Sequence, residues 1–107
     1  MITADAPTLD ALEQSAAHAA ALLKSLANEH RLMILCQLGT GEMQVAQILS
    51  GVKLSQSALS QHLARLREDG LVATRREGVA IFYRIDDPAV LKVIATLAEI
   101  YCPSEKA

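Results

Sequence analysis

Aromatic side chains and long apolar runs are both scarce in this sequence. Among its 107 residues there is no tryptophan, one phenylalanine and two tyrosines. No apolar run is long enough to span a bilayer, and the N-terminus has no signal-peptide pattern. We therefore expect a cytoplasmic protein without a membrane segment. The length predicts one domain over residues 1–107, and an apolar content of 51% is enough for a small core.

Patterns typical of enzymes and of metal sites are also missing. No Ser-His-Asp or Cys-His-Asp set stands at a recognisable spacing, and there is no glycine-rich phosphate loop. The histidines are His18, His30 and His62, and none lies four residues from another histidine or a cysteine. A tetrahedral site needs about four N, S or O ligands. The sequence therefore predicts no catalysis, no metal site and no cofactor.

Two cysteines, Cys36 and Cys102, are the only thiols, and they form no metal-binding motif. Helical phasing places each at the flank of an apolar stripe, where a thiol can be packed and still reachable. The alternative is a pair of small buried hydrophobic residues, the commonest fate of free cysteine.

The net charge of −2 argues at first against a nucleic-acid-binding protein, but its distribution favours one. Residues 53–84 hold six basic and three acidic side chains, a net charge of +3. Residues 1–52 carry −3, and residues 85–107 carry −2. A local basic patch is what contact with a phosphate backbone requires, and such binding weakens with salt.

Periodicity and capping residues predict five helices and one hairpin. The helices cover residues 9–26, 28–38, 43–50, 55–69 and 88–102, and the hairpin strands cover 71–76 and 80–85 around Glu77-Gly78-Val79. Asn28, Ser55 and Asp87 are suitable helix N-caps, and Gly70 is a suitable C-terminal stop. The fold class is thus mainly α with a small β-hairpin.

The helix predicted over residues 55–69 has a narrow apolar stripe and a polar far face. Leu59, Leu63 and Leu66 share the stripe. The far face is small and polar, with one guanidinium from Arg65, which suits entry into a DNA major groove. A solvated surface helix is the alternative. The hairpin that follows is basic, which favours a winged helix-turn-helix, with the helix-turn-helix over about 43–69 and the wing over about 71–85. A non-DNA interaction module on this fold is a further alternative.

The helices at the two ends of the chain, 9–26 and 88–102, carry apolar faces broader than one small core needs. They predict a homodimer formed through these helices. The alternative is that both faces are buried in the core of a single chain.

This architecture resembles the ArsR/SmtB family of bacterial repressors. The resemblance rests on the sequences Asn28–Leu35 and Ser57–Leu63 and on Gly70-Leu71-Val72. It implies a dimer that binds double-stranded operator DNA and releases it on sensing a ligand or a redox change. The implied DNA-contacting residues are Gln56, Ser57, Ser60, Gln61, His62 and Arg65 on the helix, and Arg75 and Arg76 on the wing.

The sequence departs from the metal sensors of that family. The stretch Glu42–Gln47, which matches the thiol ligands of arsenic and cadmium sensors, contains no cysteine. The last helix contains no histidine, whereas zinc sensors have histidine and carboxylate ligands there. The resemblance therefore disfavours a metal-sensing repressor.

The placement of Cys36 in the second helix and Cys102 at the end of the last is similar to the dithiol subgroup of BigR/SqrR type. That likeness implies a repressor with small-molecule persulfides as inducers. Cys36 and Cys102 would join in an intramolecular di- or polysulfide that weakens operator binding. The alternatives are a general oxidant-responsive regulator, a redox-insensitive regulator, and an anti-repressor.

Overall fold

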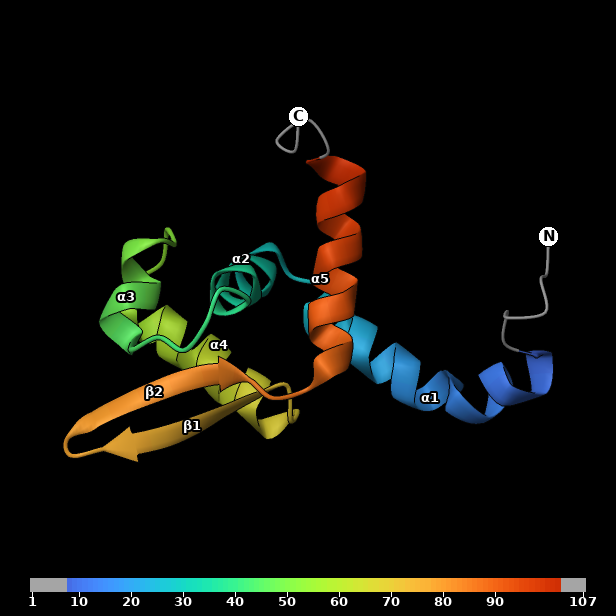
Figure 1. Cartoon of the computed structure of the whole chain (residues 1–107), viewed down its shortest axis with the longest axis horizontal. Coiled ribbons are helices and arrows are strands. Elements are labelled where there is room, and N and C mark those ends of the chain that lie inside the picture. The colour runs from blue at the N-terminus through green and yellow to red at the C-terminus, as the bar shows by residue number, and fades with distance from the viewer. Residues whose placement is uncertain (1–7, 103–107) are drawn as a thin grey trace.

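The computed structural model describes residues 8–102, which form five helices and a two-stranded antiparallel sheet (Figure 1). The helices are α1 (Leu9–Leu26), α2 (Glu29–Leu38), α3 (Val45–Ser50), α4 (Gln56–Glu68) and α5 (Pro88–Tyr101), and the strands are β1 (Val72–Glu77) and β2 (Ala80–Ile85). The predicted fold class, a mainly α winged helix-turn-helix, is confirmed.

Capping side chains set where three of the helices begin. Asn28, Ser55 and Asp87 each accept a hydrogen bond from a backbone N–H in the first turn of α2, α4 and α5, respectively. These bonds satisfy donors that a helix start otherwise leaves unpaired. All three caps were predicted from the sequence alone.

A Schellman motif ends α4. Gly70 has a φ of 79°, in the left-handed region that favours glycine. Its N–H donates to the Arg67 carbonyl at 3.0 Å, and the Leu71 N–H donates to the Leu66 carbonyl at 2.9 Å. Leu66 and Leu71 are both buried, so the motif also fixes the direction in which the chain leaves for β1.

Several predicted boundaries were wrong by one or two residues, and two of these errors have a visible cause. The third helix begins at Val45 rather than at Met43, because the Met43 backbone pairs with Tyr83 of β2 as an isolated bridge. The hairpin loop is Gly78-Val79 rather than residues 77–79, since Glu77 pairs with Ala80. Gly78 has a φ of 64°, as a type II′ turn requires at its first central position.

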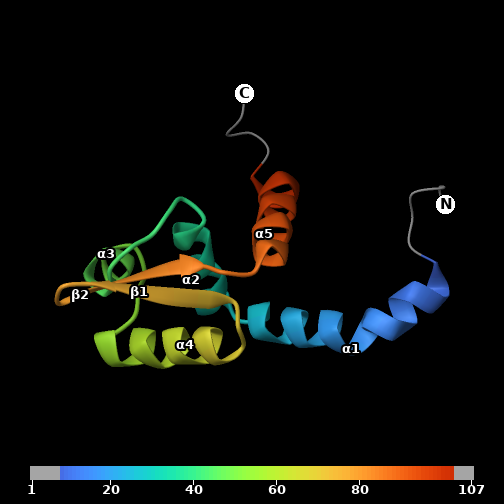
Figure 2. The same cartoon turned by 60° about the horizontal axis from the view of Figure 1, so that its bottom comes forward.

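The core lies between α2, α3, α4 and the base of the hairpin. Its buried side chains are Leu26, Ile34, Leu35, Leu38, Ile48, Leu59, Leu63, Leu66, Leu71, Val72 and Val90. Helix α1 extends away from this body, and α5 rises from it in another direction (Figures 1 and 2). Residues 9–21 of α1 are all exposed, and so are Leu91, Ile100 and Tyr101 of α5. The single chain therefore does not bury the whole apolar faces of its first and last helices, which was the alternative to a dimer.

Candidate nucleic-acid interface and cysteine pair

Helix α4 presents a polar face to solvent because its apolar stripe is fully used by the core. Leu59, Leu63 and Leu66 are at most 1% exposed. The exposed side chains on the helix include five of the predicted DNA contacts: Gln56, Ser57, Ser60, Gln61 and Arg65. Helix α4 runs alongside the hairpin, as Figure 2 shows, so helix and wing lie on neighbouring parts of the surface. Amides, hydroxyls and a guanidinium in such an array can pair with base edges and phosphates.

The placement of His62 differs from that of the other predicted contacts on α4. His62 is half-buried, and its ring centroid lies 5.9 Å from that of His30 on α2. Burial lowers the pKa of His62, and the nearby Arg31 and His30 lower it further. The side chain therefore packs toward α2, on the flank of α4 rather than on its outward face.

The two predicted wing contacts also differ from each other. Arg76 is exposed. Arg75 is held by carboxylates: its Nε lies 2.8 Å from Glu42, and its Nη1 lies 3.0 Å from Glu77. Its guanidinium carbon also lies 4.5 Å from the centroid of the Phe82 ring. Hydrogen bonds to Glu42 and Glu77 raise the pKa of Arg75, and the bond to Glu42 has the larger effect. Arg75 thus joins the wing to the segment before α3.

Cys36 and Cys102 come from two helices that lie side by side. Cys36 lies on α2, Cys102 follows the last turn of α5, and these two helices pack against each other. Both thiols are exposed, so the alternative of two buried hydrophobic cysteines is wrong. Although part of Cys36 is accessible, partial burial raises the pKa of its thiol, and Cys102 raises it further.

Comparison with known proteins identifies the family. Residues 28–74 match the family described as "Bacterial regulatory protein, arsR family". The chain is 47% identical over 98 residues to "Transcriptional activator HlyU" of Vibrio cholerae, covering 92% of this chain and 91% of that protein. It is 42% identical over 98 residues to "Biofilm growth-associated repressor" of Agrobacterium fabrum, and the match covers 92% of this chain and 84% of that protein. The chain belongs to the arsR family of bacterial regulatory proteins.

Solved structures of arsR-type regulators have the same fold. The structure described as "Reduced HlyU from Vibrio cholerae N16961" superposes with a TM-score of 0.80 at 49% identity, covering 88% of this chain and 99% of that one. The transcriptional repressor BigR from Xylella fastidiosa superposes with a TM-score of 0.85 at 38% identity, and the match covers 90% of this chain and 98% of that chain. The resemblance stated from sequence is confirmed, and this arsR-family chain is a transcriptional regulator rather than an enzyme.

Residues 8–102 of this arsR-family chain contain neither a metal-ligand cluster nor a membrane-spanning helix. No three histidine, cysteine or acidic side chains in that range gather closely enough to hold a metal ion. No helix in the same range combines the length and the apolar character that crossing a bilayer requires.

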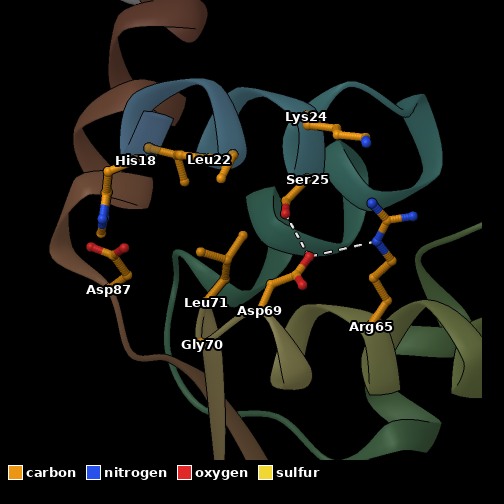
Figure 3. Close-up of a pocket in the computed structure, with 10 residues that line it drawn as sticks. His18, Leu22, Lys24, Ser25, Arg65, Asp69, Gly70, Leu71 and Asp87 are labelled. Atoms are coloured by element: carbon orange, nitrogen blue, oxygen red, sulfur yellow. Dashed lines mark hydrogen bonds and ion pairs between the residues drawn. The ribbon is translucent and has the colours of Figure 1, made fainter. Parts of the chain in front are cut away.

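A cavity of about 420 Å³ lies where α1, the end of α4 and the start of α5 meet (Figure 3). Ser25 of α1 and Asp69 at the end of α4 form a hydrogen bond at its wall. No pattern in the sequence pairs these two residues. A serine in a last helical turn and an aspartate after a helix both look like ordinary surface residues, and their contact arises only when α1 packs on α4.

Proposed function

We propose that this regulator is a homodimeric repressor that binds operator DNA and senses persulfides through Cys36 and Cys102. The observation that carries the proposal is the cysteine pair itself. Both thiols are exposed, and the helices α2 and α5 from which they come pack against each other. An exposed pair of this kind can react and then cross-link. The solved relative described as reduced is consistent with a redox-responsive subgroup.

In the proposed complex, α4 enters the major groove and the wing lies over the flanking backbone. The exposed residues of α4 supply base and phosphate contacts, and Arg76 approaches a phosphate. Arg75 approaches the DNA backbone from its position beside Glu42. His62 contributes from the flank of α4, where it contacts α2.

The homodimer is proposed from apolar surface that one chain leaves uncovered. On α1, Leu9, Leu12 and Leu23 are 77%, 52% and 59% exposed, and on α5, Ile100 and Tyr101 are 59% and 76% exposed. Large exposed apolar side chains gathered on two helices are typical of protein interfaces. A twofold dimer would also place two copies of α4 against successive grooves.

The proposed chemistry is two successive thiolate displacements. One cysteine thiolate attacks the outer, sulfane sulfur of a persulfide R–S–SH, which forms Cys–S–SH and releases the thiolate R–S⁻. The other cysteine thiolate then attacks the inner sulfur, which forms the Cys36–Cys102 disulfide and releases HS⁻. The persulfide is the two-electron oxidant. If both cysteines are first persulfidated, the same displacement leaves a trisulfide and HS⁻.

The environment of Cys36 favours this thiol for the second displacement. Since partial burial and Cys102 raise the pKa of Cys36, this thiol is less ionised near neutral pH than an ordinary cysteine. It is therefore suited to the second, resolving displacement. A direct disulfide needs Cα atoms within roughly 7 Å. A longer sulfur chain tolerates a wider gap, which would favour persulfide over peroxide as the inducer.

Cross-linking would weaken DNA binding by tying the last helix to α2. A dimer with altered α5 packing would no longer align its two α4 helices with successive grooves. A 100-fold loss of affinity requires only about 2.7 kcal/mol of coupling.

The test starts from DNA selection. The reduced protein should enrich a duplex from a random library, and a glutathione persulfide donor should then lower its affinity for that duplex. Intact mass should show the loss of two hydrogens, or that loss plus one or more sulfur atoms. Hydrogen peroxide, assayed in parallel, should act more weakly. Unchanged affinity after persulfide treatment, or equal loss in Cys36→Ser and Cys102→Ser variants, would overturn the sensing mechanism.

A second candidate, activation, is favoured by the name of one relative. The 47% identical HlyU is described as a transcriptional activator. An arsR-type regulator can activate by displacing another repressor from the same DNA. Transcription in vitro separates the two. A repressor lowers transcript levels by itself, whereas an anti-repressor changes them only when the second DNA-binding protein is present.

A further inference from the structure

Ser25 is one of two polar residues buried in the described part of the chain, and the other is Arg31. Ser25 is 4% exposed and lies in the last turns of α1. Its hydroxyl donates to Oδ2 of Asp69 at 2.5 Å, across 44 residues of sequence. A buried hydroxyl requires such a partner, so the contact ties α1 to the C-terminal end of α4.

Arg31 holds the same turn of α1 from the other side. Its Nε donates to the Ser25 carbonyl at 2.6 Å, and its Nη2 donates to the Lys24 carbonyl at 3.5 Å. These carbonyls belong to the end of α1, where a helix leaves acceptors unpaired. Ser25 is therefore fixed through its backbone by α2 and through its side chain by Asp69.

Asp69 contacts Arg65 as well. The same Oδ2 atom lies 3.5 Å from Arg65 Nε, and Figure 3 shows both contacts converging on it. The Arg65 side chain is 45% exposed. Since Asp69 engages Nε, the terminal nitrogens of the guanidinium retain N–H donors for another acceptor. Asp69 thus restrains an arginine of α4 that is partly exposed and also lines the cavity beside α1.

The position of Asp69 is unfavourable for the helix alone. Asp69 is the C-cap of α4, and a carboxylate at a helix C-terminus opposes the helix dipole. Its contacts to Ser25 and Arg65 offset this cost.

We propose that Asp69 is a positioning residue for DNA recognition. It aims the Arg65 guanidinium, and through Ser25 it holds the DNA-reading helix α4 at a set angle to α1. This inference rests on the proposed function, because it assigns a role within the same DNA-binding face. Since α1 is also a proposed dimer helix, the Ser25–Asp69 bond joins the dimer interface to the reading helix.

The main test compares Asp69→Asn with Glu68→Gln. Both changes remove one negative charge at the same end of α4, but Glu68 is exposed and Asp69 holds Arg65. The measured quantity is selectivity, the ratio of the dissociation constants for a scrambled duplex and for the duplex that the wild type selects. Asp69→Asn should lower selectivity about tenfold, the scale of one well-placed arginine contact. Glu68→Gln should strengthen binding to both duplexes and leave selectivity within about twofold.

A second set of variants keeps Asp69 intact. Ser25→Ala should lower selectivity about five- to tenfold, at unchanged helix content and dimer mass. Ser25→Thr retains the hydroxyl and should restore selectivity to within about twofold of wild type. Thr40→Ala removes an exposed hydroxyl that bonds only to the nearby Gln37 carbonyl, and it is the matched control.

The outcomes separate this inference from the proposed function. If the wild type enriches no duplex, the proposed function fails and this inference fails with it. If the wild type selects a duplex but Asp69→Asn matches Glu68→Gln, only the positioning role is overturned. Equal weakening of both duplexes by Ser25→Ala, with a lower melting temperature and no rescue by Ser25→Thr, would overturn it in the same way.

Discussion

Met43 and Tyr83 exchange two backbone hydrogen bonds, with N–O distances of 3.0 and 2.8 Å. This bridge joins the segment before α3 to the middle of strand β2, so the hairpin is attached to the start of the helix-turn-helix. The neighbouring residue Glu42 adds an ion pair to Arg75 of β1. Backbone and side-chain contacts together fix the wing to the segment that leads into α3.

The two wing arginines should contribute differently to the salt dependence of DNA binding. Arg76→Ala should flatten the plot of log K against log salt by about 0.9, the value for one phosphate contact. Arg75→Ala should flatten it less, because Glu42 and Glu77 already neutralise that guanidinium. The measurement is fluorescence anisotropy with the selected duplex at several salt concentrations. A larger change for Arg75→Ala than for Arg76→Ala would show that Arg75 leaves its carboxylates to bind phosphate.

The apolar stripe of α4 should account for much of the stability of this small domain. Leu63 is 1% exposed, and Leu63→Ala should lower the free energy of unfolding by about 2–5 kcal/mol. Gln61→Ala, on the exposed side of the same helix, should change it by less than about 0.5 kcal/mol. Urea denaturation followed by circular dichroism measures both. Similar values for the two variants would mean that α4 is not anchored through this stripe.

Stability should fall as the pH drops below the ordinary pKa of histidine, 6.5, because of His62. Burial and the nearby Arg31 lower the pKa of His62 in the folded state. In the pH range from that lowered pKa up to 6.5, the unfolded chain therefore binds a proton that the folded chain resists, so unfolding is favoured.

Urea midpoints between pH 7.5 and 5 should therefore decline less steeply in His62→Gln than in wild type. His18→Gln alters an exposed histidine on α1 and is the control. If the wild-type and His62→Gln curves run parallel over this range, the half-buried position of His62 has no influence on stability.

The left-handed conformation of Gly70 should make this position sensitive to substitution. No atom lies within 4 Å of the position that a Cβ would occupy, so the cost arises from the backbone φ of 79° alone. Gly70→Ala should cost about 1 kcal/mol or more. Gly70→Asn should cost less, because asparagine tolerates this region. Thermal unfolding of the two variants tests the order, and a smaller loss for alanine would contradict it.

Much of the fold could be predicted because its signals are local. Asn28, Ser55 and Asp87 cap helices through side-chain bonds within a few residues. The leucine spacing in α4 identifies its buried face whatever that face packs against. The error at the start of α3 has a non-local cause, since the Met43 backbone pairs with Tyr83, 40 positions later in the sequence.

The candidate site was predicted less completely, because the direction of a side chain depends on neighbours from other elements. From the sequence, His62 and Arg75 were predicted to contact DNA in the same way as Ser60 and Arg76. In the structure, His62 packs beside His30, and Arg75 pairs with Glu42. These partners lie 32 and 33 positions away in the sequence, and helical phasing contains no information about them.

The sequence by itself determined the elements, their order, the polar face of α4 and the presence of two thiols. These follow from side-chain periodicity, capping and composition, which act over a few residues. Only the tertiary structure decided that the helices carrying the two thiols pack together, that Ser25 bonds to Asp69, and that part of the apolar surface of α1 and α5 remains uncovered. Each depends on how helices distant in sequence pack around one core, and packing is a property of the whole chain.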